Sequence, residues 1–558
     1  MKSHYILLLL FQVICWFSIE AQTRDWLWFQ DAGGEQYDQA YAIATSPAGD
    51  TYVTGYYESP AVFGSIDVPC NGYHDSYIAK INSEGVWQWV RNLSSILYDD
   101  GVDIVVDDEG SVYAMGYVSR PVTCGPFSID CSPGFIAHYI VKLNTNGDWV
   151  WVRSYLTPTE TSSVGFSQLL LANDGSMYIS GGFTNTVSFG THQITSAGNS
   201  DVFIGKIDID GNWLWVESMG GSESDVCFDM ASDSLDNVYL CGLFVGAGHF
   251  GSYDLTSSGY NDIFITKFND AGVCEWAVQA GSPDEFDWIR GITVDNENNV
   301  YFSGGYYGTG TFGTNVFTSQ GNMDFVIGKL TSNGEWLWAQ SYGSVGSDAS
   351  WGIISDQQGS IYGTGEFCAN ITLGSTQLTC MADRDIFVYK IDSSGNIEWA
   401  GSASPIGGAA PRGLSIDLSS NIYIAGGYYM DFTLGQIFAP DPGQMNLYVA
   451  KYGIEASSQE DVCQENASSI VTYPNPFSKQ LNIKFQTKTA HVQYAGIYNI
   501  RGQLVYSQEV DHGDGEVVLT WDGHDSKGSR CASGVYTLKM TLSDHTSVLK
   551  HFTLLESE

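Results

Sequence analysis

The sequence predicts an all-β protein, a seven-bladed β-propeller followed by a small Ig-like β-sandwich. Three marks recur in a fixed order: a lysine closing a short apolar run such as YIAK or FITK, a tyrosine with glycine three residues later, and a Trp-x-Trp pair or single tryptophan. Each mark occurs seven times, at intervals close to 61 residues, so we expect seven tandem copies of one unit. The lysines are Lys80, Lys142, Lys206, Lys267, Lys329, Lys390 and Lys451. The tyrosines are Tyr52, Tyr113, Tyr178, Tyr239, Tyr301, Tyr362 and Tyr423.

Each copy is expected to contain four short strands. The residues around the repeated tyrosine are β-branched, aromatic or small, and the Trp-x-Trp spacing places both indoles on one face of a strand. Turn-forming segments such as NSEG and SPAGD separate these runs. The last two strands of a copy are joined by about four residues, which is typical of a hairpin. A four-stranded antiparallel sheet repeated in tandem is typical of the blades of a β-propeller.

The two ends of the array predict how the ring closes. The segment TRDWLWFQ precedes the first copy as a spare last strand, and the seventh copy lacks a last strand of its own. We therefore expect Trp26 to Phe29 to pair with the strand that ends at Lys451. This pairing removes an exposed sheet edge, which otherwise invites aggregation. The propeller is expected over residues 22–453.

The N-terminus predicts export. Lys2 precedes an apolar run from Ile6 to Ile19, and Ala21 follows closely, which is the pattern of a signal peptide over residues 1–21. No other run is long and apolar enough for a transmembrane segment. The chain carries a net charge of −40. Nucleic acid and anionic membrane surfaces are poor partners for so negative a protein.

The C-terminal part has a different composition. Residues 454–470 are small, polar and acidic, as in a linker. Residues 471–558 contain further short alternating runs, among them LNIKF, AGIYNI and GVYTLKM, which predict a small β-sandwich.

Four motifs in this region, YPNPF, IYNIRGQLV, WDGHDSKG and SGVYTLKM, resemble the C-terminal sorting domain of the type IX secretion system. The resemblance implies that the type IX machinery recognises this domain and carries the protein across the outer membrane of a Gram-negative bacterium. It would then be released or held at the cell surface. An ordinary Ig-like adhesion domain is the alternative. The motif residues are Tyr473, Pro474, Asn475, Pro476, Phe477, Trp521, Asp522, Gly523, Asp525, Gly528, Gly534 and Tyr536.

The repeats between residues 24 and 453 resemble the SBBP class of β-propeller repeats, on strings such as DSYIAKINSEG and AYAIATSPAGDTYVTG. This resemblance implies a fold and not an activity, because propellers host many functions. The common motifs of metalloproteases, serine hydrolases, P-loop proteins and dinucleotide-binding proteins are absent from the sequence. We therefore assign no catalytic residue, and the cofactor stays unknown.

Two segments hold closely spaced oxygen donors, DIDGN at 208–212 and DNENN at 295–299. Calcium binding is one interpretation of these donors. Plain hairpin turns are the favoured alternative, because the corresponding turns of other copies have too few carboxylates. We therefore assign no metal ligand.

One position of the repeat carries a different residue type in most copies, whereas neighbouring positions keep the same type. Eleven residues before each repeated tyrosine lie Tyr41, Val102, Ser167, Phe228, Arg290, Trp351 and Arg412. This position is near the start of the first strand of each copy, which is the strand closest to the axis of a propeller. Arg, Trp and Tyr are enriched where binding energy concentrates. Tyr41, Arg290, Trp351 and Arg412 would lie on adjacent blades and form a ligand-binding arc for an acidic sugar or a carboxylate-bearing peptide. Ordinary variability at a strand end is the alternative.

Two functions from different classes follow. The first is a secreted or cell-surface binding or scaffold protein with a glycan or protein partner. The second is an extracellular polysaccharide-active enzyme, a lyase or hydrolase, with its site at the mouth of the propeller channel. The second stays open because a propeller can gather an active site from distant blades.

Overall fold

The computed structural model describes residues 24–131, 135–158, 163–283, 286–405, 409–454, 469–473, 479–487, 492–499, 504–512, 515–542 and 547–554. The expected signal peptide and residues 455–468 of the expected linker lie outside these ranges. The chain divides into two units, Met1–Glu455 and Ala456–Glu558. Every element of the described residues is a β-strand, and none forms a helix of the length and hydropathy that crossing a bilayer requires.

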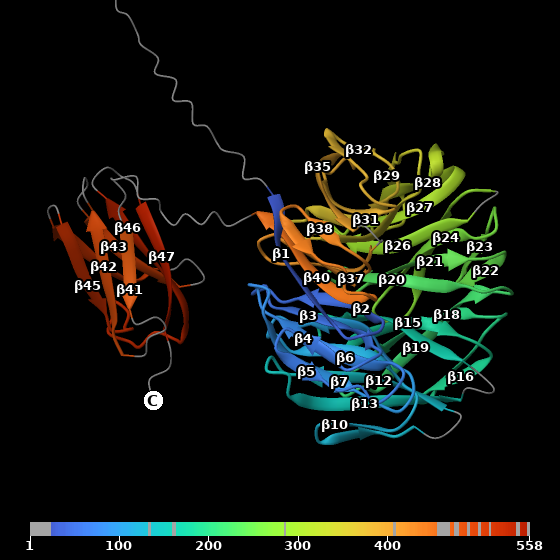
Figure 1. Ribbon diagram of the computed structural model, residues 1–558, viewed down its shortest axis with the longest axis horizontal. Helices are drawn as coiled ribbons and strands as arrows, with labels where there is room; N and C mark the ends of the chain where they lie inside the picture. Colours follow the sequence, from blue (N-terminus) through green and yellow to red (C-terminus); the bar gives the residue numbers. More distant parts are fainter. Residues whose placement is uncertain are drawn as a thin grey trace, which may run out of the picture. The chain divides into compact units, whose positions relative to one another are not determined.

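The repeats of the first unit fold as antiparallel sheets in which consecutive strands are neighbours (Figure 1). The first three sheets are β2–β3–β6–β7 (Asp38–Thr45, Thr51–Tyr57, Asp75–Ile81, Trp87–Leu93), β8–β9–β12–β13 (Asp99–Val106, Val112–Val118, Phe135–Leu143, Trp149–Pro158) and β14–β15–β18–β19 (Val164–Leu171, Met177–Phe183, Asp201–Ile207, Trp213–Gly221). The next three are β20–β21–β24–β25 (Val226–Ser232, Val238–Phe244, Asp262–Phe268, Cys274–Ala280), β26–β27–β28–β29 (Asp287–Val294, Val300–Phe312, Asn315–Leu330, Trp336–Tyr342) and β30–β31–β34–β35 (Asp348–Ser355, Ile361–Phe367, Asp385–Ile391, Ile397–Pro405).

Short hairpins connect the second and third strands of most sheets. In the fifth sheet, β27 and β28 are instead long enough to form this hairpin themselves. The hairpin strands are β4 (Ala61–Phe63), β5 (Ile66–Val68), β10 (Val122–Cys124), β11 (Phe127–Ile129), β16 (Thr186–Phe189), β17 (His192–Thr195), β22 (Ala247–Phe250), β23 (Tyr253–Thr256), β32 (Ile371–Leu373), β33 (Thr376–Leu378), β38 (Phe432–Leu434) and β39 (Ile437–Ala439).

The remaining sheet joins the two ends of the array. It has the order β36–β37–β40–β1, with bounds Ala409–Ile416, Ile422–Tyr428, Asn446–Ile454 and Arg24–Gly33, and it continues through the hairpin β4–β5 of the first repeat. Strand β1 runs antiparallel to β40, with Trp28 opposite Lys451 and Phe29 opposite Ala450. The first strand thus supplies the last position of the last sheet, as the sequence predicts, and Figure 1 shows the blue β1 beside the orange β40.

The repeated lysine and tyrosine form the same contact in every copy. The ammonium group of the lysine on the third strand lies 4.7 to 5.9 Å from the ring centroid of the tyrosine on the second strand. A carboxylate completes each group, as in the pairs Lys80–Asp50, Lys142–Asp107, Lys206–Asp174, Lys267–Glu275, Lys329–Asp295, Lys390–Glu398 and Lys451–Asp417. A cation over a ring and beside a carboxylate is stabilised by both. The lysine repeat is therefore structural.

A tryptophan on the last strand connects one repeat to the next at five places; it is the second of a Trp-x-Trp pair or, in the fourth sheet, the single Trp276. Its indole N–H donates to a backbone carbonyl oxygen in the hairpin turn of the following sheet, at 3.0 to 3.1 Å. The donor and acceptor residues are Trp28 and Ser83, Trp89 and Thr145, Trp215 and Asp270, Trp276 and Ser332, and Trp338 and Ser393.

The indole ring also rests on a glycine of the same turn. A Cβ atom added to Gly85, Gly147, Gly272, Gly334 or Gly395 would lie 2.6 to 2.9 Å from the ring, and each of these glycines has φ between 76° and 86°. Glycine is therefore required twice, for the left-handed backbone and for the close approach. We call this tryptophan–turn contact the inter-repeat bracket. Trp28 of β1 forms the bracket with the first sheet, just as internal tryptophans do with their neighbours.

Buried carboxyl groups also bridge neighbouring repeats. Asp103 accepts hydrogen bonds from the backbone N–H of Ile104 and, in the next repeat, of Leu169, at 2.8 and 2.7 Å. Asp229 accepts from Ile292 of the next repeat at 2.9 Å. Burial raises the pKa of Asp103 and of Asp229 to about 7, although these hydrogen bonds oppose the rise.

The second unit contains two antiparallel sheets. One has the order β41–β42–β45 (Ser469–Tyr473, Leu481–Thr487, Gly515–Trp521), and the other β44–β43–β46–β47 (Leu504–His512, Val492–Asn499, Gly534–Leu542, Ser547–Leu554). Trp521 is fully buried in the core, where its ring meets that of Tyr536 edge-on at 5.3 Å. This arrangement agrees with the predicted Ig-like sandwich.

Truncating Trp28 to alanine should destabilise the first unit as much as truncating Trp338, because both side chains make the same bracket. We expect each variant to lose about 2–4 kcal/mol, from the lost indole contact and hydrogen bond. Chemical unfolding followed by fluorescence measures this loss. An unchanged stability of Trp28→Ala beside a destabilised Trp338→Ala would contradict the equivalence of β1 with internal last strands.

Thermal stability should be higher near pH 5.5 than near pH 8. The folded-state pKa values of Asp103 and Asp229 lie above their unfolded value of 3.8, so the folded protein binds these protons more tightly than the unfolded chain does. The free energy of unfolding therefore falls as the pH rises through about 7, where the folded protein loses these protons. Calorimetry at the two pH values should give a Tm at least about 2 °C higher at the lower pH. The difference should shrink in the variant Asp103→Asn with Asp229→Asn, and an unchanged difference would contradict this origin.

Candidate functional site

The variable position of the repeat coincides with a β-bulge. In each first strand the register against the second strand shifts at one residue, and these residues are Tyr41, Val102, Ser167, Phe228, Arg290, Trp351 and Arg412. A bulge places two residues opposite one and re-aims a side chain without disturbing the rest of the strand. The sequence identified the position, and the bulge explains why it varies while its neighbours repeat.

The repeated glycine makes room for the bulge. A Cβ atom added to Gly55 would lie 2.0 Å from the backbone oxygen of Gln39, and one added to Gly242 would lie 2.0 Å from that of Val226. Only glycine permits so close an approach of two backbones. The glycine in the second strand and the variable residue in the first are thus two parts of one local structure.

The first strands of all the sheets surround one cavity of about 670 Å³, which we call the central cavity. Six of the bulge residues line it, and Ser167 is replaced by its neighbour Gln168. The four residues of the predicted arc, Tyr41, Arg290, Trp351 and Arg412, are therefore brought together around a single space.

Arg290 lies among aromatic rings. Its guanidinium carbon is 4.1 Å from the ring centroid of Phe228, 4.2 Å from that of Trp288 and 5.5 Å from that of Trp351. Burial, together with the positive charge of Arg412, lowers the pKa of Arg290 to about 10. Its Nε is buried and has no hydrogen-bond partner among the described residues.

Arg412 is exposed to the cavity, with its guanidinium carbon 5.1 Å from the ring centroid of Trp351. No ion pair within the described part of the chain involves Arg412 or Arg290. The two guanidinium groups thus flank one indole without a carboxylate partner. Such a pair of cations suits the bidentate recognition of an anionic group.

Beside Arg412, the central cavity is acidic and aromatic, because Tyr41 and Asp100 line it there. Tyr41 contacts Tyr56, whose ring stacks on His74 at a centroid distance of 4.2 Å. His74 lies 3.1 Å from Glu58 and 3.3 Å from Asp100, and its hydrogen bond to Asp100 raises its pKa. Burial raises the pKa of Tyr41 to about 12, with Asp100 adding to the rise and Arg412 opposing it. The cavity therefore holds both basic and acidic groups, with Tyr41 close to Arg412 and to Asp100.

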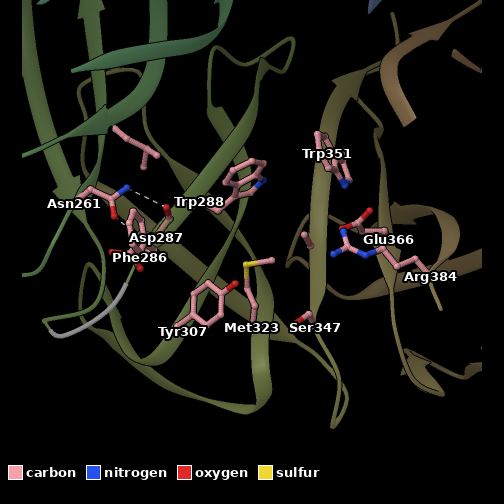
Figure 2. Close-up of a pocket in the computed structure, with 12 residues that line it drawn as sticks. Asn261, Phe286, Asp287, Trp288, Tyr307, Met323, Ser347, Trp351, Glu366 and Arg384 are labelled. Carbon is pink, nitrogen blue, oxygen red and sulfur yellow. Dashed lines mark hydrogen bonds and ion pairs between the residues drawn. The ribbon is translucent and has the colours of Figure 1, made fainter. Parts of the chain in front are cut away.

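A second pocket of about 700 Å³ adjoins the central cavity, and we call it the aromatic pocket (Figure 2). Trp351 lines both spaces. The other residues of the aromatic pocket are Leu243, Asn261, Phe286, Asp287, Trp288, Tyr307, Met323, Ser347, Ala349, Glu366 and Arg384. Sequence reasoning missed this pocket, because its residues come from strand ends and connections of several repeats that share no repeated sequence mark.

The two candidate calcium segments are hairpin turns. In the first, one oxygen of Asp208 accepts hydrogen bonds from the backbone N–H of Asp210 and Asn212, both at 2.9 Å. Asp295 does the same with Glu297 and Asn299. Within the ranges that the structure describes, no three His, Cys, Asp or Glu side chains gather closely enough to hold a metal ion.

The residues of the predicted sorting motif differ in where they lie in the structure. Pro474, Asn475, Pro476 and Phe477 lie outside the described residues, and Tyr473 ends β41. Asp522 and Asp525 each accept a hydrogen bond from a backbone N–H two residues later, and Gly523 and Gly528 have positive φ. Gly534 begins β46, and the Tyr536 hydroxyl donates to the backbone oxygen of Ala532. The segment WDGHDSKG is therefore a pair of tight turns beside the buried Trp521.

Residues 474–545 match the family described as the FlgD Ig-like domain. Over 183 residues, 29% of the chain, the sequence is 29% identical to 13% of the uncharacterized WD repeat-containing protein L264 of Acanthamoeba polyphaga mimivirus. Over 48% of the chain it is 24% identical to 29% of the regulatory protein FlaEY of Caulobacter vibrioides. The chain thus spans less than a third of the length of these curated relatives.

Two solved structures of β-propeller proteins are similar to this chain. PorZ, a surface component of the type IX secretion system of Porphyromonas gingivalis, is 12% identical, with a TM-score of 0.24 over 94% of this chain and 75% of PorZ. YCF48 bound to D1 peptide is 7% identical, with a TM-score of 0.35 over 76% of this chain and 94% of YCF48.

Proposed function

We propose that the protein is an extracellular binding or scaffold protein that recognises an anionic group in its central cavity. The observation that carries this proposal is the pair of guanidinium groups of Arg290 and Arg412 beside Trp351, neither of them paired with a carboxylate. The ligand is a glycan or a protein that presents a carboxylate.

Burial of Arg290 explains why such a ligand would bind well. A partly buried cation without a partner has lost hydration and gained only ring contacts, so a carboxylate would recover a charge-assisted hydrogen bond. Its pKa of about 10 leaves Arg290 charged at neutral pH. The faces of Trp351 and Tyr41 offer apolar surface for the neighbouring part of the ligand.

The proposal includes a closed ring of seven blades over residues 22–453. Support comes from the pairing of β1 with β40 and from the bracket between Trp28 and Ser83, which repeats the contact between internal sheets. A closed ring fixes the distances between bulge residues, so that the arc is formed before the ligand arrives. The comparison of Trp28→Ala with Trp338→Ala tests this closure.

The proposal also includes export by the type IX secretion system. After removal of a signal peptide over residues 1–21, residues 471–558 would act as the sorting domain, joined by the linker at 454–470, and the protein would reach the outer surface of a Gram-negative bacterium. The four sorting motifs and the Ig-like fold of this region support the assignment.

A polysaccharide lyase or hydrolase is the second candidate. The observation in its favour is the cluster of Tyr41, Tyr56, His74 and Asp100, which places groups able to donate and accept protons beside Arg412. An acidic sugar held by the arginines would face this cluster.

Binding of acidic ligands should depend on the two arginines. The probes are oligogalacturonate and randomised heptapeptides, tested with the full chain for both binding and cleavage. The variant Arg290→Ala with Arg412→Ala should lose about 100-fold in affinity, as expected for two charge-assisted contacts. Arg120→Ala, outside both cavities, is the control. Unchanged affinity of the double variant for every binding probe, or no binding of any probe, would overturn the site.

The C-terminal unit should be required for export and not for folding of the repeats. A chain ending at residue 465 should keep the thermal transition of the first unit and accumulate in the periplasm of a host with the type IX machinery. Cell fractionation and surface labelling measure its location, with the full chain as control. Delivery of the shortened chain to the surface would contradict the sorting assignment.

A further inference from the structure

We infer that the aromatic pocket receives a large apolar side chain of a peptide whose adjacent acidic residue reaches Arg290 and Arg412. The ligand of this protein is then a peptide segment and not a glycan. The inference rests on the proposed function for the acidic half of the ligand, and the aromatic pocket supplies the apolar half.

The walls of the aromatic pocket are apolar over most of their surface. Phe286, Trp288 and Trp351 contribute rings, and Met323 and Leu243 contribute aliphatic surface. Figure 2 shows Asn261, Phe286 and Asp287 at one end, and Glu366 and Arg384 at the other. A concave space of this size with mostly apolar walls favours an apolar occupant.

The polar side chains of the aromatic pocket are largely committed to one another. The amide of Asn261 donates to the backbone oxygen of Asp287 at 3.2 Å and accepts from its N–H at 3.2 Å. The carboxylate of Asp287 accepts from Ser282, at 2.8 Å from both its backbone N–H and its hydroxyl. Glu366 pairs with Arg384 at 2.5 Å.

These hydrogen bonds and this ion pair argue against a sugar ring as the occupant of the aromatic pocket. A sugar carries a hydroxyl group on most of its carbon atoms, and a hydroxyl buried without a partner costs free energy. The indole N–H groups of Trp288 and Trp351 are buried and have no hydrogen-bond partner in the described ranges. Two free donors suit the carbonyl oxygens of a peptide next to an apolar side chain better than they suit a ring of hydroxyls.

The aromatic pocket and the arginines are close enough for adjacent residues of one ligand. The Trp288 ring separates them, since it faces the guanidinium of Arg290 at 4.2 Å and also lines the pocket. Trp288 meets Trp351 edge-on at 5.7 Å, and Trp351 lines both spaces. A side chain beyond these rings and a carboxylate over the arginines can therefore belong to neighbouring residues of one short peptide.

The rim carries exposed aromatic rings. Phe286 is 53% exposed and Tyr260 is 64% exposed, and the two rings contact each other in a tilted arrangement at a centroid distance of 4.3 Å. Exposed aromatic residues at the edge of an apolar pocket are typical of protein-binding surfaces. In a chain with a net charge of −40, two free guanidinium groups beside this rim are locally complementary to an acidic peptide.

The test is a selection of displayed, randomised heptapeptides on the purified full chain, followed by affinity measurement with the enriched peptides made synthetically. We expect enrichment of a large aromatic or aliphatic residue next to Asp or Glu. Replacing the apolar residue of the peptide by alanine, or its acidic residue by the amide, should each weaken binding about tenfold or more. Phe286→Ala should weaken binding about fivefold, whereas Phe438→Ala, an equally exposed phenylalanine outside both cavities, should not.

The outcomes separate this inference from the proposed function. Oligogalacturonate binding that depends on Arg290 and Arg412, together with no enriched peptide, would overturn the peptide inference and leave the arginine site intact. Enriched peptides that are acidic and insensitive to Phe286→Ala and to loss of their apolar residue would do the same. Enriched peptides that bind the variant Arg290→Ala with Arg412→Ala as well as they bind the unchanged protein would overturn both.

Discussion

The arrangement of the first unit depends on the inter-repeat bracket, in which one indole rests on a glycine turn of the next sheet. Each sheet is held internally by its ladder, and only three of the described last strands, β1, β19 and β35, also pair with the hairpin of the next repeat. The bracket fixes how one sheet sits against the next through a hydrogen bond and a ring contact that tolerate no Cβ atom at the glycine. In one pair of repeats the stem of Arg153 rests on Gly211 in place of an indole. The position of the contact is therefore kept even where its chemistry changes.

The bulge in each first strand separates the structural residues from the variable ones. Residues such as Ile43 and Ile104 pack into the cores between sheets, while the bulged residue just before them projects into the central cavity. A change at the bulge alters the cavity, and only Val102 and Phe228 among the bulge residues also pack against a core. This division explains how Arg290, Trp351 and Arg412 can stand in equivalent positions of otherwise similar strands.

Much of the fold could be predicted because the residues that each strand requires recur at the same spacing in several copies of the repeat. The spacing of Lys80, Tyr52 and Trp89 recurs in other copies, and the pairing of β1 with β40 followed from the missing strand after Lys451. The arc was also visible, because variation stands out against repetition. The cluster of His74 with Asp100 and the aromatic pocket were not visible. Their residues come from strands and connections of different repeats, such as Glu366 on β31 and Asn261 just before β24, and no periodic signal joins them.

The pairing of β1 with β40 also constrains the order of folding. Arg24 pairs with Ile454, so the contact that completes the last sheet joins positions separated by nearly the whole unit. Contacts between such distant positions form slowly, since the chain between them must first be ordered. When the N-terminus is synthesised or translocated first, β1 has no ladder partner until all the repeats have left the ribosome or the pore. An apolar strand with an open edge is prone to association. Factors that shield residues 24–33 during transit would therefore decide the yield of this protein more than the final stability of its sheets.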